Sequence, residues 1–89
     1  MEYLIIVFDT TGFAMQAESF FKAKSIKYEI MPTPREISLS CGISIRLDSS
    51  NLDFLIECIR GNKIHVKDIF EAVGVGASRK IKKLDIKLP

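Results

Sequence analysis

The first third of the chain carries apolar patterns that predict a strand, a helix and a second strand. Tyr3–Phe8 is a continuous β-prone run, which is typical of a buried strand. A helix should follow and end near Lys24–Ser25, because apolar residues recur at helical spacing on one face: Phe13, Ala17, Phe20 and Phe21. Ile26–Met31 then alternates as a second strand, and Pro32 and Pro34 end it.

The second half of the chain begins with the same order of patterns. In Ile43–Leu47 the apolar residues alternate with Ser44 and Arg46, which predicts a third strand with one polar face. Ser50 and Asp53 have the spacing of a capping box at the start of a second helix. The apolar stripe of this helix is formed by Leu52, Leu55, Ile56 and Ile59.

The segment that follows Gly61–Asn62 fits two structures. Gly61–Asn62 is a suitable end for the second helix. Beyond it, Val66, Ile69, Phe70 and Val73 have helical spacing, but the β-branched content and the position in the chain favour a fourth strand over residues 63–73.

Two strand-helix-strand halves joined by a hairpin predict an α+β fold. The expected architecture is a ferredoxin-like β-α-β-β-α-β sandwich, in which a four-stranded antiparallel sheet of order 4-1-3-2 carries both helices on one face. Residues 1–73 would form this domain. Residues 74–89 form a basic C-terminal tail that starts with a glycine-containing break over residues 74–78. The basic part after the break is open to three interpretations: an extra edge strand, a docking arm or a partly disordered tail. The exposed face should carry Ser44 and Arg46, and such a face is compatible with a homodimer.

Composition narrows the class of protein. The chain has 89 residues, of which 47% are hydrophobic, and two cysteines in different settings, so we expect one small domain without a disulfide framework. No apolar run approaches the roughly 20 residues of a membrane span. The net charge of +2 does not by itself indicate nucleic acid, and the third strand lacks the aromatic residues that stack on RNA bases. These features predict a cytoplasmic protein with reduced thiols and neither a membrane nor a nucleic-acid partner.

Cys41 is the candidate reactive group. It lies in a proline-bounded loop in which Ser38 and Ser40 offer hydroxyl donors and Arg35 offers a positive charge. Gly42 leaves room beside the sulfur and gives the backbone freedom to turn. A thiol in such surroundings can ionise, and the thiolate is the reactive form. The structural alternative is that Cys41 is a small buried hydrophobe near the start of a strand.

The expected topology gives Cys41 a specific neighbourhood. The end of the first strand and the start of the third would be adjacent, so Cys41 should lie near the N-terminus of the first helix. Thr10, Thr11 and Gly12 occur there, and the free N–H groups of a helix N-terminus favour an anion. The second helix should end at the same edge with Arg60 and Lys63.

Other candidate sites are weaker. Cys58 lies off the apolar stripe of the second helix, which predicts a residue at the boundary of the core. His65 alternates with Ile64 and Val66, so it should face solvent, and we expect no metal site. The chain has no Cys-x-x-Cys pair and no phosphate-binding loop, which argues against a thioredoxin-like motif, a soft-metal chaperone and a nucleotide-binding site.

The loop before the third strand also carries a resemblance. Residues 34–42 read Pro-Arg-Glu-Ile-Ser-Leu-Ser-Cys-Gly. This stretch resembles the Pro-Arg-Glu-Ile-Ser-x-Ser-Cys-Gly motif of the Se/S carrier protein-like family of small bacterial proteins, which also has a hydroxyl-rich turn after its first strand, here Thr10 and Thr11. The resemblance covers about residues 3–73 and leaves the basic tail outside.

The resemblance implies a role for Cys41. It would carry sulfur or selenium covalently, as a persulfide or selenosulfide, in a carrier protein rather than a turnover enzyme, with no other cofactor. The implied partner is a protein such as a cysteine desulfurase or an acceptor enzyme. The alternative is an adaptor that docks on a redox or sulfur-transfer enzyme without carrying anything.

Overall fold

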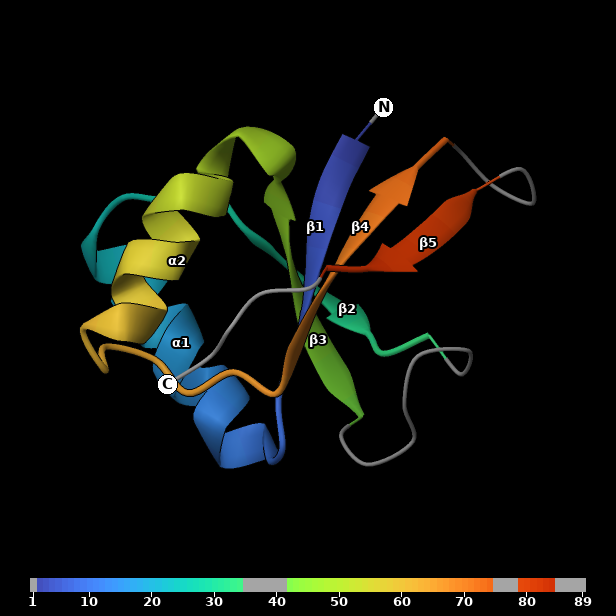
Figure 1. Ribbon diagram of the computed structural model, residues 1–89. Helices are drawn as coiled ribbons and strands as arrows, with labels where there is room; N and C mark the ends of the chain where they lie inside the picture. Colours follow the sequence, from blue (N-terminus) through green and yellow to red (C-terminus); the bar gives the residue numbers. More distant parts are fainter. Residues whose placement is uncertain (1, 35–41, 75–78, 85–89) are drawn as a thin grey trace.

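The helices and strands follow one another in the order β-α-β-β-α-β-β in the computed structural model (Figure 1). The structure describes residues 2–34, 42–74 and 79–84. The elements are β1 (Glu2–Val7), α1 (Thr11–Ala23), β2 (Glu29–Pro32), β3 (Ile43–Asp48), α2 (Leu52–Arg60), β4 (Asp68–Val73) and β5 (Lys80–Lys83). A 3₁₀ turn, Ser49–Asn51, joins β3 to α2.

The strands form one antiparallel sheet in the order β2-β3-β1-β4-β5. The first four strands therefore have the order expected from the sequence. The expected count of four strands is wrong, because Lys80–Lys83 pairs with β4 as a fifth strand at the edge. For these residues the extra edge strand, one of the three interpretations of the tail, is confirmed. Residues 63–73, which fitted a helix or a strand, form a strand over residues 68–73.

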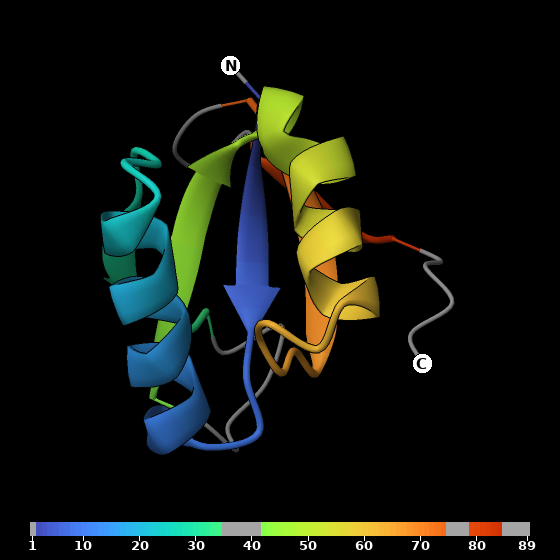
Figure 2. The same cartoon turned by 90° about the vertical axis from the view of Figure 1, so that its left-hand side faces the viewer.

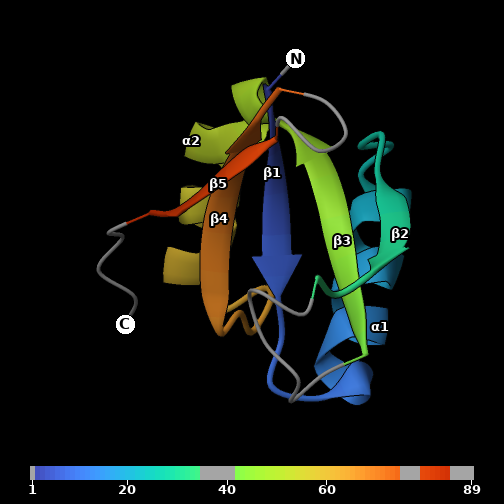
Figure 3. The same ribbon diagram turned by 90° about the vertical axis from the view of Figure 1, so that its right-hand side faces the viewer.

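Both helices cover the same face of the sheet (Figures 2 and 3). On that face, alternate residues of β1 and β3 pack with the helices in one buried cluster, which includes Leu4, Ile6, Ala17, Phe21, Ile45, Leu47, Leu55 and Ile59. Neither described helix is long and apolar enough to cross a membrane.

The opposite face of the sheet carries a smaller buried cluster, formed by Tyr3, Ile5, Val7 and Ala72. Ser44 and Arg46 lie opposite Val7 and Ile5 in the β1–β3 register, so both belong to this face, as expected. Ser44 is nevertheless fully buried, and its hydroxyl is within 2.7 Å of the Thr33 hydroxyl. The polar side chain is therefore hydrogen-bonded within the protein rather than presented to solvent.

The start of α2 differs from the predicted capping box. The Asp48 carboxylate accepts the backbone N–H of Ser50 at 3.0 Å and also the Ser50 hydroxyl, and these two bonds lower the pKa of Asp48. They cap the 3₁₀ turn, so α2 begins later, at Leu52. The Ser50 hydroxyl is engaged in this turn and does not cap Asp53.

Replacement of Phe21 by alanine should strongly destabilise the fold. Phe21 is fully buried, and the centre of its ring lies 6.1 Å from that of Phe20 and 6.4 Å from that of Tyr28. Loss of such a ring leaves a cavity and costs about 3–5 kcal/mol. Phe13→Ala in the same helix removes a ring that is 36% exposed and should cost less than about 1 kcal/mol. Urea unfolding of both variants measures the difference, and equal losses would contradict the assigned core.

Candidate functional site

The end of β1 and the start of β3 lie side by side at one end of the sheet. The two strands are antiparallel neighbours, and Val7 pairs with Ser44 near the end of one and the start of the other. The adjacency predicted from the sequence is therefore confirmed. Gly42, the residue before β3, accepts the backbone N–H of Thr33 at 3.2 Å, which extends the β2–β3 ladder beyond the strands themselves.

The N-terminus of α1 lies at the same end of the molecule (Figures 2 and 3). Thr10 is extended and caps the helix, because its Oγ1 accepts the backbone N–H of Phe13 at 3.1 Å. Thr11 and Gly12 are the first residues of the helix, and both are exposed. The first turn contains no acidic residue, so no carboxylate within it offsets the positive end of the helix dipole.

The segment after α2 also reaches this end. The ring of His65 lies 5.0 Å from the ring of Phe13, in the first turn of α1. His65 is exposed, as the sequence predicted. Arg60 and Lys63, the cations expected at this edge, are exposed, and the ring contact to α1 is made by His65 instead. No pattern in the sequence indicates this contact, because it joins residues from the two halves of the chain.

Half of the predicted site residues lie outside the described residues: Arg35, Ser38, Ser40 and Cys41. Among the described ones, Thr10, Thr11 and Gly12 lie together at the start of α1. Gly42 lacks a positive φ, and a Cβ added to it would meet no described atom within 4 Å. Neither backbone geometry nor described packing therefore requires glycine at position 42.

Cys58 belongs to the core rather than to its boundary, so the prediction from the helical stripe is wrong. Its side chain is 5% exposed and packs in the cluster beneath the helices. The chain turns back over the end of α2, where the Lys63 N–H donates to the Cys58 carbonyl oxygen at 2.9 Å. Desolvation raises the pKa of the Cys58 thiol, which disfavours the reactive thiolate.

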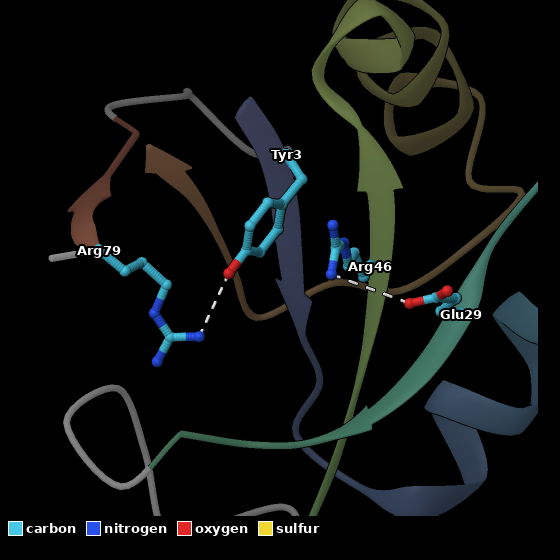
Figure 4. A network of polar contacts seen from close by, with 4 residues as sticks. All are labelled: Tyr3, Glu29, Arg46 and Arg79. Carbon is cyan, nitrogen blue, oxygen red and sulfur yellow. Dashed lines mark hydrogen bonds and ion pairs between the residues drawn. The ribbon is translucent and has the colours of Figure 1, made fainter. Parts of the chain in front are cut away.

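A polar network that the sequence analysis did not predict lies on the face of the sheet opposite the helices (Figure 4). The guanidinium of Arg46 lies 3.9 Å from the centre of the Tyr3 ring, and Arg79 donates to the Tyr3 hydroxyl at 3.2 Å. Arg46 also lies 3.9 Å from the Glu29 carboxylate. These contacts bury Tyr3 to 7% exposure, so its ring is covered by a guanidinium rather than open to a stacking ligand.

A pocket of about 290 Å³ opens beside this network. It is lined by Glu2, Tyr3, Lys27, Tyr28, Glu29, Arg46, Leu47, Asp48 and Asn51. Asp48 is the last residue of β3, roughly 20 Å along the strand from Gly42 at about 3.3 Å per residue. The pocket therefore lies at the other end of β3 from the candidate site. No group of three or more potential metal ligands occurs in residues 2–34, 42–74 and 79–84.

Comparison with known proteins identifies the family. Residues 3–71 match the family described as "Putative Se/S carrier protein-like". The chain belongs to this family, which confirms the resemblance inferred from residues 34–42. No curated protein and no solved structure matches the chain.

Thr10→Ala should destabilise the protein by about 1 kcal/mol, because it leaves the Phe13 N–H without its capping partner. Thr11→Ala removes the neighbouring exposed hydroxyl and should change stability by less than about 0.5 kcal/mol. Thermal or urea unfolding of the two variants compares the cap with its neighbour. A larger effect at Thr11 would show that the cap is assigned to the wrong threonine.

Cys41 should be alkylated before Cys58 at neutral pH. Burial and the raised pKa of Cys58 should slow its reaction in the folded protein by about tenfold or more relative to the unfolded chain. Brief iodoacetamide treatment with and without urea, followed by mass mapping, gives both rates. Labelling of Cys58 at an equal or greater rate than Cys41 in the folded protein would contradict this order.

Proposed function

We propose that the protein carries sulfur or selenium on Cys41, as a persulfide or a selenosulfide. The observation that carries this proposal is membership of the Se/S carrier protein-like family, together with the Pro-Arg-Glu-Ile-Ser-Leu-Ser-Cys-Gly stretch of residues 34–42. The state of the second thiol supports the choice of cysteine. Cys58 is buried and its pKa is raised, so it is poorly suited to exchange sulfur with another protein.

The proposed transfer is a thiol exchange in two steps. The Cys41 thiolate attacks the outer sulfur of a persulfide on a donor enzyme, such as a cysteine desulfurase. The S–S bond of the donor breaks as the new S–S bond to Cys41 forms, and the donor leaves as a thiolate. An acceptor thiolate then takes the outer sulfur and releases the Cys41 thiolate, so the carrier undergoes no net oxidation. A cytoplasmic location would keep the unloaded thiol reduced.

The loaded group needs stabilisation as an anion rather than a base. A persulfide is more acidic than a thiol, so the carrier would hold a negative charge at neutral pH. Thr11 and the backbone N–H groups of Gly12 and Gly42 are the described donors that we assign to this role. The positive end of the α1 dipole would favour the same charge.

In the loop itself, Ser38 and Ser40 would add hydroxyl donors, and Arg35 would add a positive charge. Thr10 would act mainly by positioning, because its hydroxyl oxygen caps α1.

Cys41→Ser should abolish loading and leave the fold intact. The experiment incubates the protein with a cysteine desulfurase and free cysteine and then measures the intact mass. The wild type should gain a sulfur-sized adduct that cyanide removes, since cyanide takes sulfane sulfur from a persulfide. Cys58→Ala is the matched control, and it should load like the wild type because it retains Cys41.

Two results would overturn the carrier proposal. Failure of the wild type to gain a sulfur-sized adduct from the desulfurase and cysteine would leave the adaptor function in its place. Equal loading of Cys41→Ser and the wild type would show that the sulfur resides on another group. Circular dichroism of Cys41→Ser excludes loss of the fold as the cause of lost loading.

A further inference from the structure

The two edges of the sheet differ in their ability to accept another strand. β2 forms one edge and β5 forms the other. An edge strand presents backbone N–H and C=O groups that can pair with another chain, and proteins commonly block such edges with proline or charge. The hydrogen-bond registers of the two strands show which groups each edge presents.

The β2 edge is blocked by proline. The Thr33 N–H donates to the Gly42 carbonyl oxygen, so Thr33 directs its backbone groups towards β3. Because this direction alternates along an antiparallel strand, the backbone groups of Met31 and Glu29 also point towards β3. The outward positions are therefore Ile30 and Pro32. Pro32 has no N–H, which leaves Ile30 as the outward N–H donor within β2.

Residues 80–84, the described part of the β5 edge, contain no proline, so this edge is protected by charge alone. The Leu84 N–H donates to the Ile69 carbonyl oxygen at 2.9 Å. Because the direction of the backbone groups alternates along the strand, those of Lys82 and Lys80 also point towards β4. Ile81 and Lys83 consequently direct their N–H and C=O groups away from β4. β5 is the outermost strand on this side of the sheet (Figure 1). Ile81 and Lys83 can donate and accept the hydrogen bonds of one further strand.

The side chains along β5 define the charge that a partner must carry. Four cations lie in and next to this strand: Arg79, Lys80, Lys82 and Lys83. Within the sheet, two of them already face carboxylates, since Lys83 Nζ lies 3.3 Å from Asp68 Oδ1 and Lys82 pairs with Glu71. Ile81 is half-buried and packs against the smaller cluster, on the face of the sheet opposite the helices. The edge is thus positively charged around one apolar position.

A second copy of this chain does not fit this edge. Antiparallel pairing of β5 with itself would bring lysines of the two copies together, and like charges on neighbouring strands are destabilising. β5 also lies outside the matched family residues 3–71, so this edge is separate from the segment on which the carrier proposal rests. Charge complementarity instead favours an extended acidic segment.

We propose that β5 binds an extended acidic segment of a partner protein as a sixth, antiparallel strand. The segment would place acidic residues opposite Lys83, Lys82 and Lys80 and an apolar residue opposite Ile81, which corresponds to the order Glu-Glu-Val-Glu. Backbone bonds to Ile81 and Lys83 hold it in register, and the lysines select its charge. This interaction is independent of sulfur loading at Cys41.

The test measures fluorescence anisotropy of a labelled peptide with Glu-Glu-Val-Glu at its centre, mixed with the full chain. Binding should weaken as salt is added, because exposed charge pairs are screened. A matched peptide with Lys-Lys-Val-Lys should not bind. N-methylation of the first Glu and the Val, which lie opposite Lys83 and Ile81, removes the two backbone donors and should weaken binding about tenfold or more.

Protein variants separate the edge from general charge. The double variant K80E/K82E should lose binding of the acidic peptide, while Lys63→Glu, at an exposed cation after α2, should retain it. Lys83→Pro keeps the backbone bonds to β4 but removes the outward N–H, the charge and the ion pair with Asp68. Lys83→Ala loses the same charge and ion pair but keeps the N–H, so the proline variant should bind the peptide about fivefold more weakly than the alanine variant. Circular dichroism and urea unfolding check that each variant is folded.

Three outcomes would overturn the proposal. Absence of binding by the acidic peptide at low salt would exclude this partner. Equal binding of the N-methylated peptide would show attraction of charge without strand addition. Tighter binding of a single-stranded oligonucleotide, lost in the same K80E/K82E variant, would identify a phosphate-binding surface instead.

Discussion

The fold depends on the burial of β1 on both of its faces. Leu4, Ile5, Ile6 and Val7 are fully buried, and β1 pairs with β3 on one side and β4 on the other. Alternate residues of this one strand therefore belong to both apolar clusters of the protein. Because β1 lies between β3 and β4, its C-terminal end is next to the start of each of these strands and also leads into α1.

The elements that could be predicted from the sequence are those whose patterns are strong within a few residues. The continuous run of β1 and the apolar faces of α1 and α2 lead directly to the observed order of the first four strands. β5 is different, because Lys-Ile-Lys-Lys has little apolar pattern and becomes a strand through pairing with β4. The capping box predicted for α2 does not form, because Ser50 donates to Asp48 and the two residues cap the 3₁₀ turn instead, and spacing alone does not decide between two local arrangements of this kind.

Part of the candidate site could be predicted, because the order of the strands follows from the strong local patterns. The adjacency of Val7 and Ser44 follows from topology, so the meeting of β1, β3 and α1 was available from the strand order. Contacts such as Phe13 with His65 depend on how the two halves pack, and no sequence period encodes them. Cys58 illustrates a limit of the helical stripe, since packing in the large core cluster buries a position that the helix alone would leave at the boundary. Arg35, Ser38, Ser40 and Cys41 lie outside the described residues, so their part of the site remains a prediction from the sequence.

The pairing of β1 with two later strands has a consequence during protein synthesis. β3 begins 41 residues after the start of β1, and β4 begins 66 residues after it. At roughly 5–20 residues per second the ribosome therefore completes β4 about 3–13 s after β1. For that interval Tyr3–Phe8 is an apolar, β-prone run without its native neighbours, which is the type of segment that self-associates. α1 is the first element able to shield it, because α1 follows immediately and its buried residues pack with Leu4 and Ile6 in the folded protein. A helix of 13 residues is marginal by itself, so helix and strand stabilise each other in the nascent chain rather than forming one after the other.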